Sequence, residues 1–206
     1  MKTMHIDDVL DRAHVVSLPL AVRFRGITTR EALLIEGPAG WGEFAPFLEY
    51  GPAESAAWLR AGLEAAYEGF PEPVRDSIEV NATIPAVPAS EVPAVVERYP
   101  GCRTFKIKVA EKGHTLADDA ARVRAVRDAV TQRGDIPILR VDANGGWTVD
   151  EAVEAAQMMM PLDYMEQPCA TTEELAQVRG RLMRAGLFVR VAADESIRKV
   201  ADPYRV

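Results

Sequence analysis

The fold of this chain is decided by one stretch of sequence, residues 136–166, which reads IPILRVDANGGWTVDEAVEAAQMMMPLDYME. Two short apolar runs, residues 136–141 and 162–165, enclose a helical stretch. Thr148 stands three residues before Glu151, which is the spacing of a capping box at the start of an α-helix. A strand, a helix and a second strand in this order predict two parallel strands joined by a helical crossover.

The same alternation continues on both sides of this unit. Further short apolar runs occupy residues 78–84, 104–109 and 187–193. Two more capping-box spacings start helices after the second and fourth runs, namely Thr115 with Asp118 and Thr171 with Glu174. We therefore expect an α/β fold with five parallel strands.

Two architectures contain such a sheet, the doubly wound sheet and the (β/α) barrel. Doubly wound nucleotide-binding proteins carry a glycine-rich turn after the first strand, and neither GxGxxG nor GxxxxGK[ST] occurs in this sequence. Charged residues stand at the ends of successive strands instead, which is typical of a barrel. The barrel is therefore the predicted architecture.

The first part of the chain, residues 1–76, has a different pattern. Apolar runs at 14–24, 31–36 and 41–47 predict strands, and a helix is expected between Pro52 and a stop at Gly69. Strands followed by a helix predict a small α+β unit. We expect a domain boundary there, with residues 77–206 forming the barrel part.

Composition excludes several classes of function. The chain has 206 residues, 24 basic and 31 acidic side chains and a net charge of −7, which argues against nucleic acid and anionic membranes as main partners. No apolar run approaches the roughly 20 residues of a membrane span, and acidic residues stand where a signal peptide would be apolar. Two cysteines are too few for a disulfide framework. We expect a cytoplasmic enzyme or small-molecule binder.

Ionisable side chains gather at the ends of the predicted strands. Lys106 and Lys108 end the second run, Asp142 the third, Glu166 the fourth and Asp194 the fifth. The carboxyl ends of barrel strands meet at one mouth, so these side chains are expected to share a site. Three carboxylates together require a cation, and Mg²⁺ prefers oxygen ligands.

A lysine beside a divalent cation has a lowered pKa, because the like charge disfavours the ammonium form. Such a lysine can remove a proton from a carbon next to a carboxylate, while the cation stabilises the enediolate that forms. The pattern therefore predicts proton abstraction from a small-molecule carboxylate.

The motifs at these strand ends resemble the muconate-lactonising subgroup of the enolase superfamily. They are Lys106-Ile107-Lys108, Val141-Asp142-Ala143-Asn144, Tyr164-Met165-Glu166-Gln167-Pro168 and Ala193-Asp194-Glu195-Ser196. The resemblance also covers 23-RFRGITTRE-31 and 40-GWGEF-44, and so extends over essentially the whole chain. It implies a (β/α) barrel preceded by an N-terminal α+β capping domain.

The resemblance also implies roles for individual residues. Asp142, Glu166 and Asp194 match metal ligands for Mg²⁺, with Mn²⁺ as an alternative metal. Lys108 matches the acid/base that removes the α-proton and then protonates the departing hydroxyl, and Lys106 matches a companion lysine that helps to depress the pKa of Lys108.

Other matching residues lie around the expected mouth. The resemblance implies that Asn144 and Arg140 support the site electrostatically, and that a loop around Arg25 and Gly26 closes over the mouth and influences substrate choice. The implied reaction is the Mg²⁺-dependent syn dehydration of a hydroxycyclohexadiene carboxylate to an aromatic succinylbenzoate in menaquinone biosynthesis.

Three interpretations stay open at this stage. The first is this dehydration, and the second is an N-acylamino acid racemase or dipeptide epimerase on the same scaffold. The third is an inactive fragment, because the family has a further lysine on a sixth strand and this sequence stops at Val206, just past the fifth run. We accordingly expect a barrel truncated after its fifth strand. The oligomeric state is left open.

Overall fold

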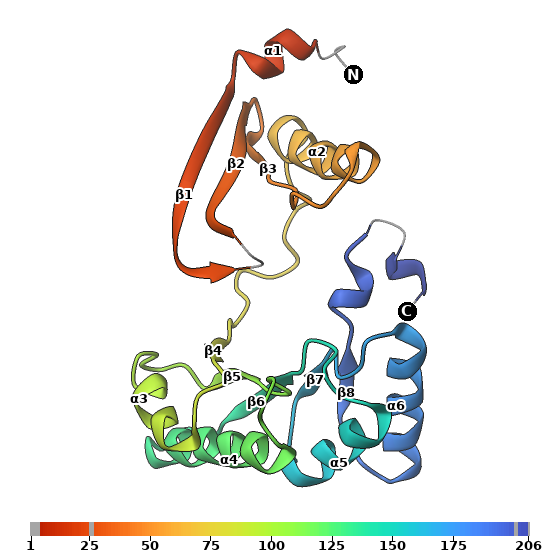
Figure 1. The fold of residues 1–206 in the computed structure, drawn as a ribbon. Helices are drawn as coiled ribbons and strands as arrows, with labels where there is room; N and C mark the ends of the chain where they lie inside the picture. The colour runs from red at the N-terminus through yellow and green to blue at the C-terminus, as the bar shows by residue number, and fades with distance from the viewer. Residues whose placement is uncertain (1–4, 25–26, 200–201, 206) are drawn as a thin grey trace. The chain divides into compact units, whose positions relative to one another are not determined.

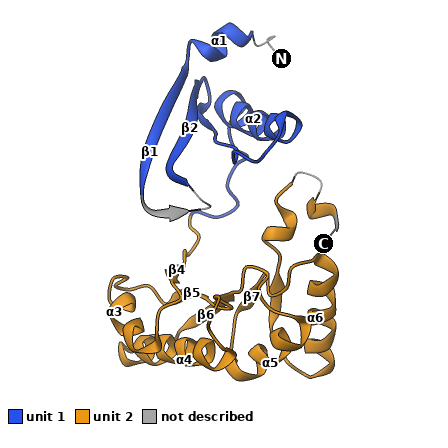
Figure 2. Cartoon of the chain, viewed as in Figure 1, with its two compact units in different colours: residues 1–76 blue, residues 77–206 orange. Residues whose placement is uncertain are grey.

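The computed structural model describes residues 5–24, 27–199 and 202–205. The chain divides into two compact units, Met1–Asp76 and Ser77–Val206, which are coloured separately in Figure 2. Among the described residues, no helix is long and apolar enough to cross a membrane.

The first unit is an antiparallel sheet with a helix packed against it (Figure 1). Its elements are α1 (Ile6–Leu10), β1 (Ala13–Phe24), β2 (Ile27–Gly37), β3 (Gly40–Phe44) and α2 (Pro52–Tyr67), with strand order β1-β2-β3. The predicted strands and helix are confirmed. β3 stops at Phe44 rather than at Phe47, because Pro46 has no backbone N–H to donate to a ladder.

Glycines bring α2 into backbone contact with the sheet. A Cβ at Gly42 would lie 1.9 Å from the carbonyl oxygen of Gly62, and one at Gly37 would lie 2.0 Å from that of Ala66. No side chain fits at these two strand positions. The close approach fixes how the helix covers β2 and β3.

The second unit is built on a five-stranded parallel sheet, as predicted. Its strands, in spatial order, are β4 (Ala82–Ile84), β5 (Thr104–Lys108), β6 (Ile138–Asp142), β7 (Tyr164–Glu166) and β8 (Arg190–Ala192). Its helices are α3 (Val92–Val96), α4 (Leu116–Gln132), α5 (Val149–Met159) and α6 (Thr172–Arg184), with 3₁₀ turns η1 (Ala89–Glu91), η2 (Glu195–Ile197) and η3 (Asp202–Arg205). The sheet order equals the chain order, as it does around a barrel.

All three predicted capping boxes are present. In α5 the backbone N–H of Thr148 donates to Glu151 Oε2 at 2.8 Å, and Thr148 Oγ1 accepts from the backbone N–H of Glu151 at 3.3 Å. The same reciprocal pair starts α4 at Thr115 and α6 at Thr171. Each helix therefore begins at a defined residue a few positions after the preceding strand ends.

The two faces of the parallel sheet differ in character. Apolar side chains on one face are almost fully buried against the helices: Phe105, Ile107, Leu139, Val141 and Met165 are 0 to 2% exposed. Alternate positions point the other way and carry Lys106, Lys108, Arg140, Asp142, Tyr164 and Glu166. The helical layer thus supplies the hydrophobic core and leaves the charged face for the site.

One buried ion pair ties α4 to the end of β5. The side chains of Asp119 and Arg122 are 1% and 2% exposed, and their charged groups lie 2.6 Å apart. Arg122 also donates to the carbonyls of Val87 at 2.6 Å and Lys108 at 3.0 Å, and Asp119 accepts from the Ala110 N–H at 2.9 Å. The pair therefore fixes the backbone on both sides of the point where β5 ends.

Replacing Asp119 by asparagine should strongly destabilise the protein. The substitution leaves the Arg122 guanidinium buried without its counter-charge, and breaking such a pair costs about 3–5 kcal/mol. Asp128→Asn is the matched control, because Asp128 is exposed on the same helix and should change stability by no more than about 0.5 kcal/mol. Urea unfolding followed by circular dichroism measures both. Equal stabilities of the two variants would contradict the role given to the buried pair.

Candidate active site

The register of the parallel sheet aligns charged residues across neighbouring strands. Lys108 of β5 pairs with Asp142 of β6, which in turn pairs with Glu166 of β7. One step toward the amino ends, Lys106 pairs with Arg140 and Arg140 with Tyr164. Because side chains two residues apart share a face, both rows project from the side of the sheet opposite the helices.

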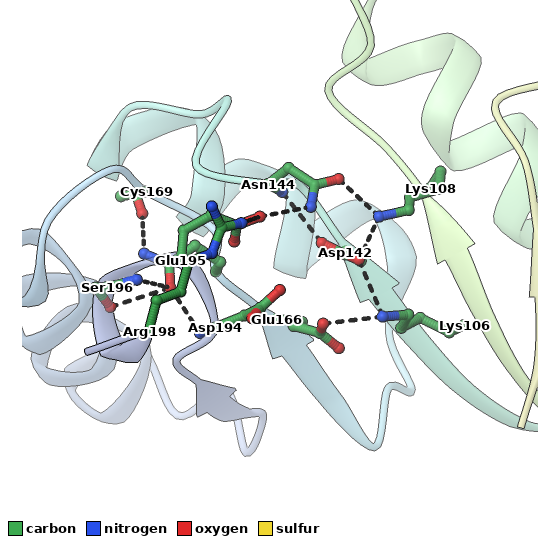
Figure 3. Close-up of polar contacts among 11 residues, drawn as sticks. Lys106, Lys108, Asp142, Asn144, Glu166, Cys169, Asp194, Glu195, Ser196 and Arg198 are labelled. Atoms are coloured by element: carbon green, nitrogen blue, oxygen red, sulfur yellow. Dashed lines mark hydrogen bonds and ion pairs between the residues drawn. The ribbon is translucent and has the colours of Figure 1, made fainter. Parts of the chain in front are cut away.

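Both lysines contact the carboxylates of this row (Figure 3). Lys106 Nζ lies 2.9 Å from Glu166 Oε1 and 3.1 Å from Asp142 Oδ2, and Lys108 Nζ lies 2.6 Å from the same Asp142 oxygen. The Asp142 side chain is 1% exposed and that of Glu166 14%, whereas those of Lys106 and Lys108 are 22% and 33% exposed. The carboxylates thus lie at the base of the cluster and the lysines reach over them.

The pKa values of the cluster reflect this mutual contact. Burial raises the pKa of Asp142, but hydrogen bonds and charge attraction from Lys108 and Lys106 outweigh it, so the net shift is downward. Burial lowers the pKa of Lys106, but hydrogen bonds and charge attraction from Glu166 and Asp142 raise it by more. The net shift in the pKa of Lys106 is therefore upward. The two carboxylates that surround the ammonium group of Lys106 are the cause of this upward shift.

Asn144 connects the cluster to the loop after β8. Its Oδ1 accepts from Lys108 Nζ at 2.8 Å, its backbone N–H donates to Asp142 Oδ1 at 3.1 Å, and its Nδ2 donates to Glu195 Oε1 at 2.9 Å. Asn144 therefore contacts both a lysine and a carboxylate of the cluster. The side chain of Asn144 thus links Lys108 to Glu195.

Three residues near these strand ends adopt left-handed backbone conformations that are rare outside glycine. They are Ala110 after β5 with φ 58°, Asn144 after β6 with φ 47°, and Gln167 after β7 with φ 36°. Such strained residues persist only where the surrounding structure holds them, and they concentrate at functional sites. The strain here falls within two residues of Lys108, Asp142 and Glu166.

Asp194 and Glu195 bring two further carboxylates to the loop after β8. Asp194 precedes η2, and its backbone N–H donates to Gln167 Oε1 at 2.7 Å. Glu195 Oε1 also accepts from Arg198 at 3.0 Å, while its Oε2 is buried without a hydrogen-bond partner in the described part of the chain. Four carboxylates therefore share this region with three cationic side chains, the two lysines and Arg198.

The donor set fits a hard divalent cation by its chemistry. Carboxylate oxygens are the ligands that Mg²⁺ prefers, acidic groups outnumber cations, and one buried carboxylate oxygen is unpartnered. Across residues 5–24, 27–199 and 202–205, however, no group of three or more histidine, cysteine, aspartate or glutamate side chains is arranged to hold a metal ion. Lys106 lies between Asp142 and Glu166 instead.

Arg140, another predicted site residue, makes its contacts away from the cluster. Arg140 donates to Asp163 Oδ2 and to Asn81 Oδ1, both at 2.9 Å, and lies over the ring of Tyr164. These contacts hold it one row below the carboxylates, toward the amino ends of the strands, and the structure does not bring it together with Asp142 or Glu166. Arg25 and Gly26 lie outside the described residues.

Gln167 and Glu195 both take part in the site, although no role was predicted for either from the sequence. Gln167 is 0% exposed and bonds to the loop after β8. Their only signal was position, because each directly follows a predicted metal ligand within a recognised motif. Charge alone did not distinguish Glu195 from the other acids of the chain.

A separate cavity of about 530 Å³ lies between the starts of α4 and α5. Its lining includes His114, Trp147 and Glu151, but none of the lysines and carboxylates of the strand-end cluster.

Cys169 is buried, and burial with the nearby acids Glu174 and Glu151 raises the pKa of its thiol to about 11. Neither feature adds a nucleophile to the cluster.

Comparison with protein families assigns both parts of the chain. Residues 15–66 match the family described as enolase N-terminal domain-like, and residues 89–205 match the family described as enolase C-terminal domain-like. The second match spans more than half of the chain and contains every lysine and carboxylate of the cluster.

Curated relatives share most of the sequence. The chain is 59% identical over 204 residues to a protein of Mycolicibacterium smegmatis named o-succinylbenzoate synthase, covering 98% of this chain and 60% of the relative. A protein of the same name from Mycobacterium leprae is 57% identical, with 98% and 58% covered. The chain thus spans about 60% of the length of the curated relatives it matches.

Solved structures share the fold. A mandelate racemase/muconate lactonizing protein from Herpetosiphon aurantiacus aligns with a TM-score of 0.65 and 26% identity over 94% of this chain and 69% of its own. The o-succinylbenzoate synthase of Thermosynechococcus elongatus, solved with Mg in its active site, aligns with a TM-score of 0.63 and 20% identity over 94% and 71%. A parallel strand-and-helix unit, a preceding α+β unit and two family matches in the same order lead to one conclusion: this chain belongs to the enolase superfamily.

Proposed function

We propose that this chain carries the Mg²⁺-binding and proton-transferring part of an o-succinylbenzoate synthase. The observation that carries the proposal is the strand-end cluster, in which Lys106 and Lys108 contact Asp142 and Glu166 within one row of the sheet. The substrate would be 2-succinyl-6-hydroxy-2,4-cyclohexadiene-1-carboxylate and the product 2-succinylbenzoate. The names of relatives 55 to 59% identical favour this reaction over others on the same scaffold.

Asp142, Glu166 and Asp194 would hold the cation, for which their carboxylate oxygens are suited. When bound there, Mg²⁺ would offset the negative charge that develops on the substrate carboxylate as the α-proton leaves. Mn²⁺ could replace it, since the donors are the same. Asn144 would keep its bonds to Asp142 and Lys108, so the lysine stays beside the carboxylate row.

Lys108 would move the proton in both halves of the reaction. Its neutral amine accepts the proton from the carbon that bears the carboxylate, and the bonding electrons spread onto that carboxylate as an enediolate. The resulting ammonium returns that proton to the hydroxyl on the neighbouring carbon. The C–O bond then breaks, water departs, and the ring becomes aromatic.

Lys106 would act as the companion cation. Its ammonium lies between Glu166 and Asp142 and is less exposed than that of Lys108. From this position it can offset carboxylate charge and add positive potential beside Lys108. The loop at Arg25 and Gly26 would contribute to substrate choice, and Arg140 would support the row from below.

Menaquinone biosynthesis is the pathway in which this product is used, and we infer a cytoplasmic location. The two cysteines, Cys102 and Cys169, are free thiols, in keeping with a reducing compartment.

Two substrates distinguish the synthase from an epimerase or racemase. The full-length protein with Mg²⁺ should bleach the diene absorbance of the cyclohexadiene carboxylate and leave an optically active N-acylamino acid or dipeptide unracemised. The reverse result would favour the epimerase function.

Glu166→Gln in the full-length protein should weaken magnesium binding, because it replaces a charged ligand by a neutral amide of the same shape. The loss in affinity should exceed the roughly 10- to 100-fold effect typical of residues that only support metal ligands. Isothermal titration with MgCl₂ measures it. Glu97→Gln is the control, since Glu97 is exposed after α3. Equal magnesium affinity of the two variants would remove Glu166 from the site.

Lys108→Met should abolish dehydration and leave magnesium affinity within a few-fold of the unsubstituted protein. A general base contributes about 10²- to 10⁴-fold, and a residue that serves both half-reactions should fall at or above the upper end. Single-turnover decay of the diene absorbance gives the rate, and Lys112→Met tests an exposed lysine four residues further along. Near-normal turnover of the Lys108 variant would show that Lys108 is not the base. Lys106 would then be the next candidate.

A further inference from the structure

Gln167 is a buried polar residue for which the proposed reaction has no direct use. It directly follows Glu166, its side chain is 0% exposed, and its backbone has a φ of 36°. Glutamine rarely adopts this left-handed conformation, and a buried amide needs hydrogen-bond partners. Both features require that the surrounding structure hold the residue in place.

The side chain of Gln167 finds its partners in the loop after β8. Its Oε1 accepts three hydrogen bonds, from the Asp194 N–H at 2.7 Å, the Ser196 Oγ at 3.1 Å and the Ser196 N–H at 3.3 Å. Its Nε2 donates to the carbonyl of Cys169 at 2.9 Å. Figure 3 shows Asp194, Ser196 and Cys169 gathered around these contacts.

The backbone of the same residue joins two neighbouring strands. The Gln167 N–H donates to the carbonyl of Ala192 at 2.8 Å, and its carbonyl accepts from the N–H of Gly145 at 2.7 Å. One residue thus contacts the segments that follow β6, β7 and β8. These are the segments that carry or adjoin Asp142, Glu166 and Asp194.

We propose that Gln167 is a positioning residue that sets the place of Asp194 relative to Glu166. Gln167 directly follows Glu166 in the chain, and its side-chain amide oxygen accepts a hydrogen bond from the backbone N–H of Asp194. The loop at Asp194 leaves the sheet after Ala192 and enters the short 3₁₀ turn η2, so ladder hydrogen bonds do not order it. The expected effect on magnesium binding rests on the proposed function. The ordering of the loop by Gln167 does not.

A purely structural role predicts a different response. If Gln167 only filled space, a shorter residue would lower global stability and would not release the loop selectively. If its oxygen orders the loop, withdrawing that oxygen frees the amides of Asp194 and Ser196 and spares Gly145, whose partner is the backbone carbonyl. Local amide exchange separates the two cases.

The test compares three substitutions in the full-length protein. Gln167→Asn shortens the side chain by one methylene and suits a left-handed backbone, so the fold should survive. Gln167→Met keeps the length of the side chain and removes the acceptor oxygen. Gln157→Asn makes the first change at an exposed site on α5 and serves as the control.

Hydrogen–deuterium exchange and magnesium titration provide the readouts. We expect Gln167→Asn to speed exchange at Asp194 and Ser196 at least tenfold, with Gly145 unchanged, and to weaken Mg²⁺ binding about 10- to 100-fold. Gln167→Met should release the same two amides, and Gln157→Asn should match the unsubstituted protein. If Gln167→Asn lacks a cooperative thermal transition, Gln167→Met decides, and unchanged exchange at Asp194 and Ser196 in that variant would overturn the proposal.

Three outcomes contradict a part of this account, and each points to a different part. Unchanged exchange at Asp194 and Ser196 in Gln167→Asn would show that the amide does not order the loop. Faster exchange with unaltered magnesium affinity would show that the loop order does not position a metal ligand. Absence of magnesium binding by the unsubstituted protein would contradict the proposed function, and the exchange measurement would still decide whether Gln167 orders the loop.

Discussion

The in-register pairing of β5, β6 and β7 is the constraint on which the rest of the site depends. Lys108, Asp142 and Glu166 occupy paired positions on three strands, so a single register defines which side chains meet. A slip of one residue in any strand would turn its charged side chain into the hydrophobic core. The same pairing buries Ile107 and Val141 against the helices, so packing of the core enforces the geometry of the charged face.

Much of this arrangement could be predicted from local patterns. Short apolar runs located every strand of the parallel sheet, and the spacing of Thr148 and Glu151 located the start of a helix, because both signals depend on residues close in sequence. The alternation of Lys106 and Lys108 predicted their common face. Strand ends were less predictable: the run at 78–84 yields only Ala82–Ile84, because pairing with β5 begins at Ala82.

Interactions between distant residues account for what the local patterns missed. Gln167 and Asn144 depend on partners in the loop after β8, 27 and 51 positions away, so neither contact follows from neighbouring sequence. The upward shift in the pKa of Lys106 depends on Glu166, 60 residues further on. Arg140 bonds to Asp163 and Asn81 one row below the carboxylates, a layer that no spacing in the sequence distinguished.

The central claim is that the carboxylates at three successive strand ends form one divalent-cation site with Lys108 beside it. A crystal structure of the full-length protein soaked in Mn²⁺, with anomalous scattering to locate the ion, tests it most directly. The account predicts one strong peak within about 2.0–2.3 Å of oxygens from Asp142, Glu166 and Asp194, with Lys106 displaced from between the first two. A peak bound elsewhere, or Lys106 still bridging Asp142 and Glu166 at saturating Mn²⁺, would contradict it.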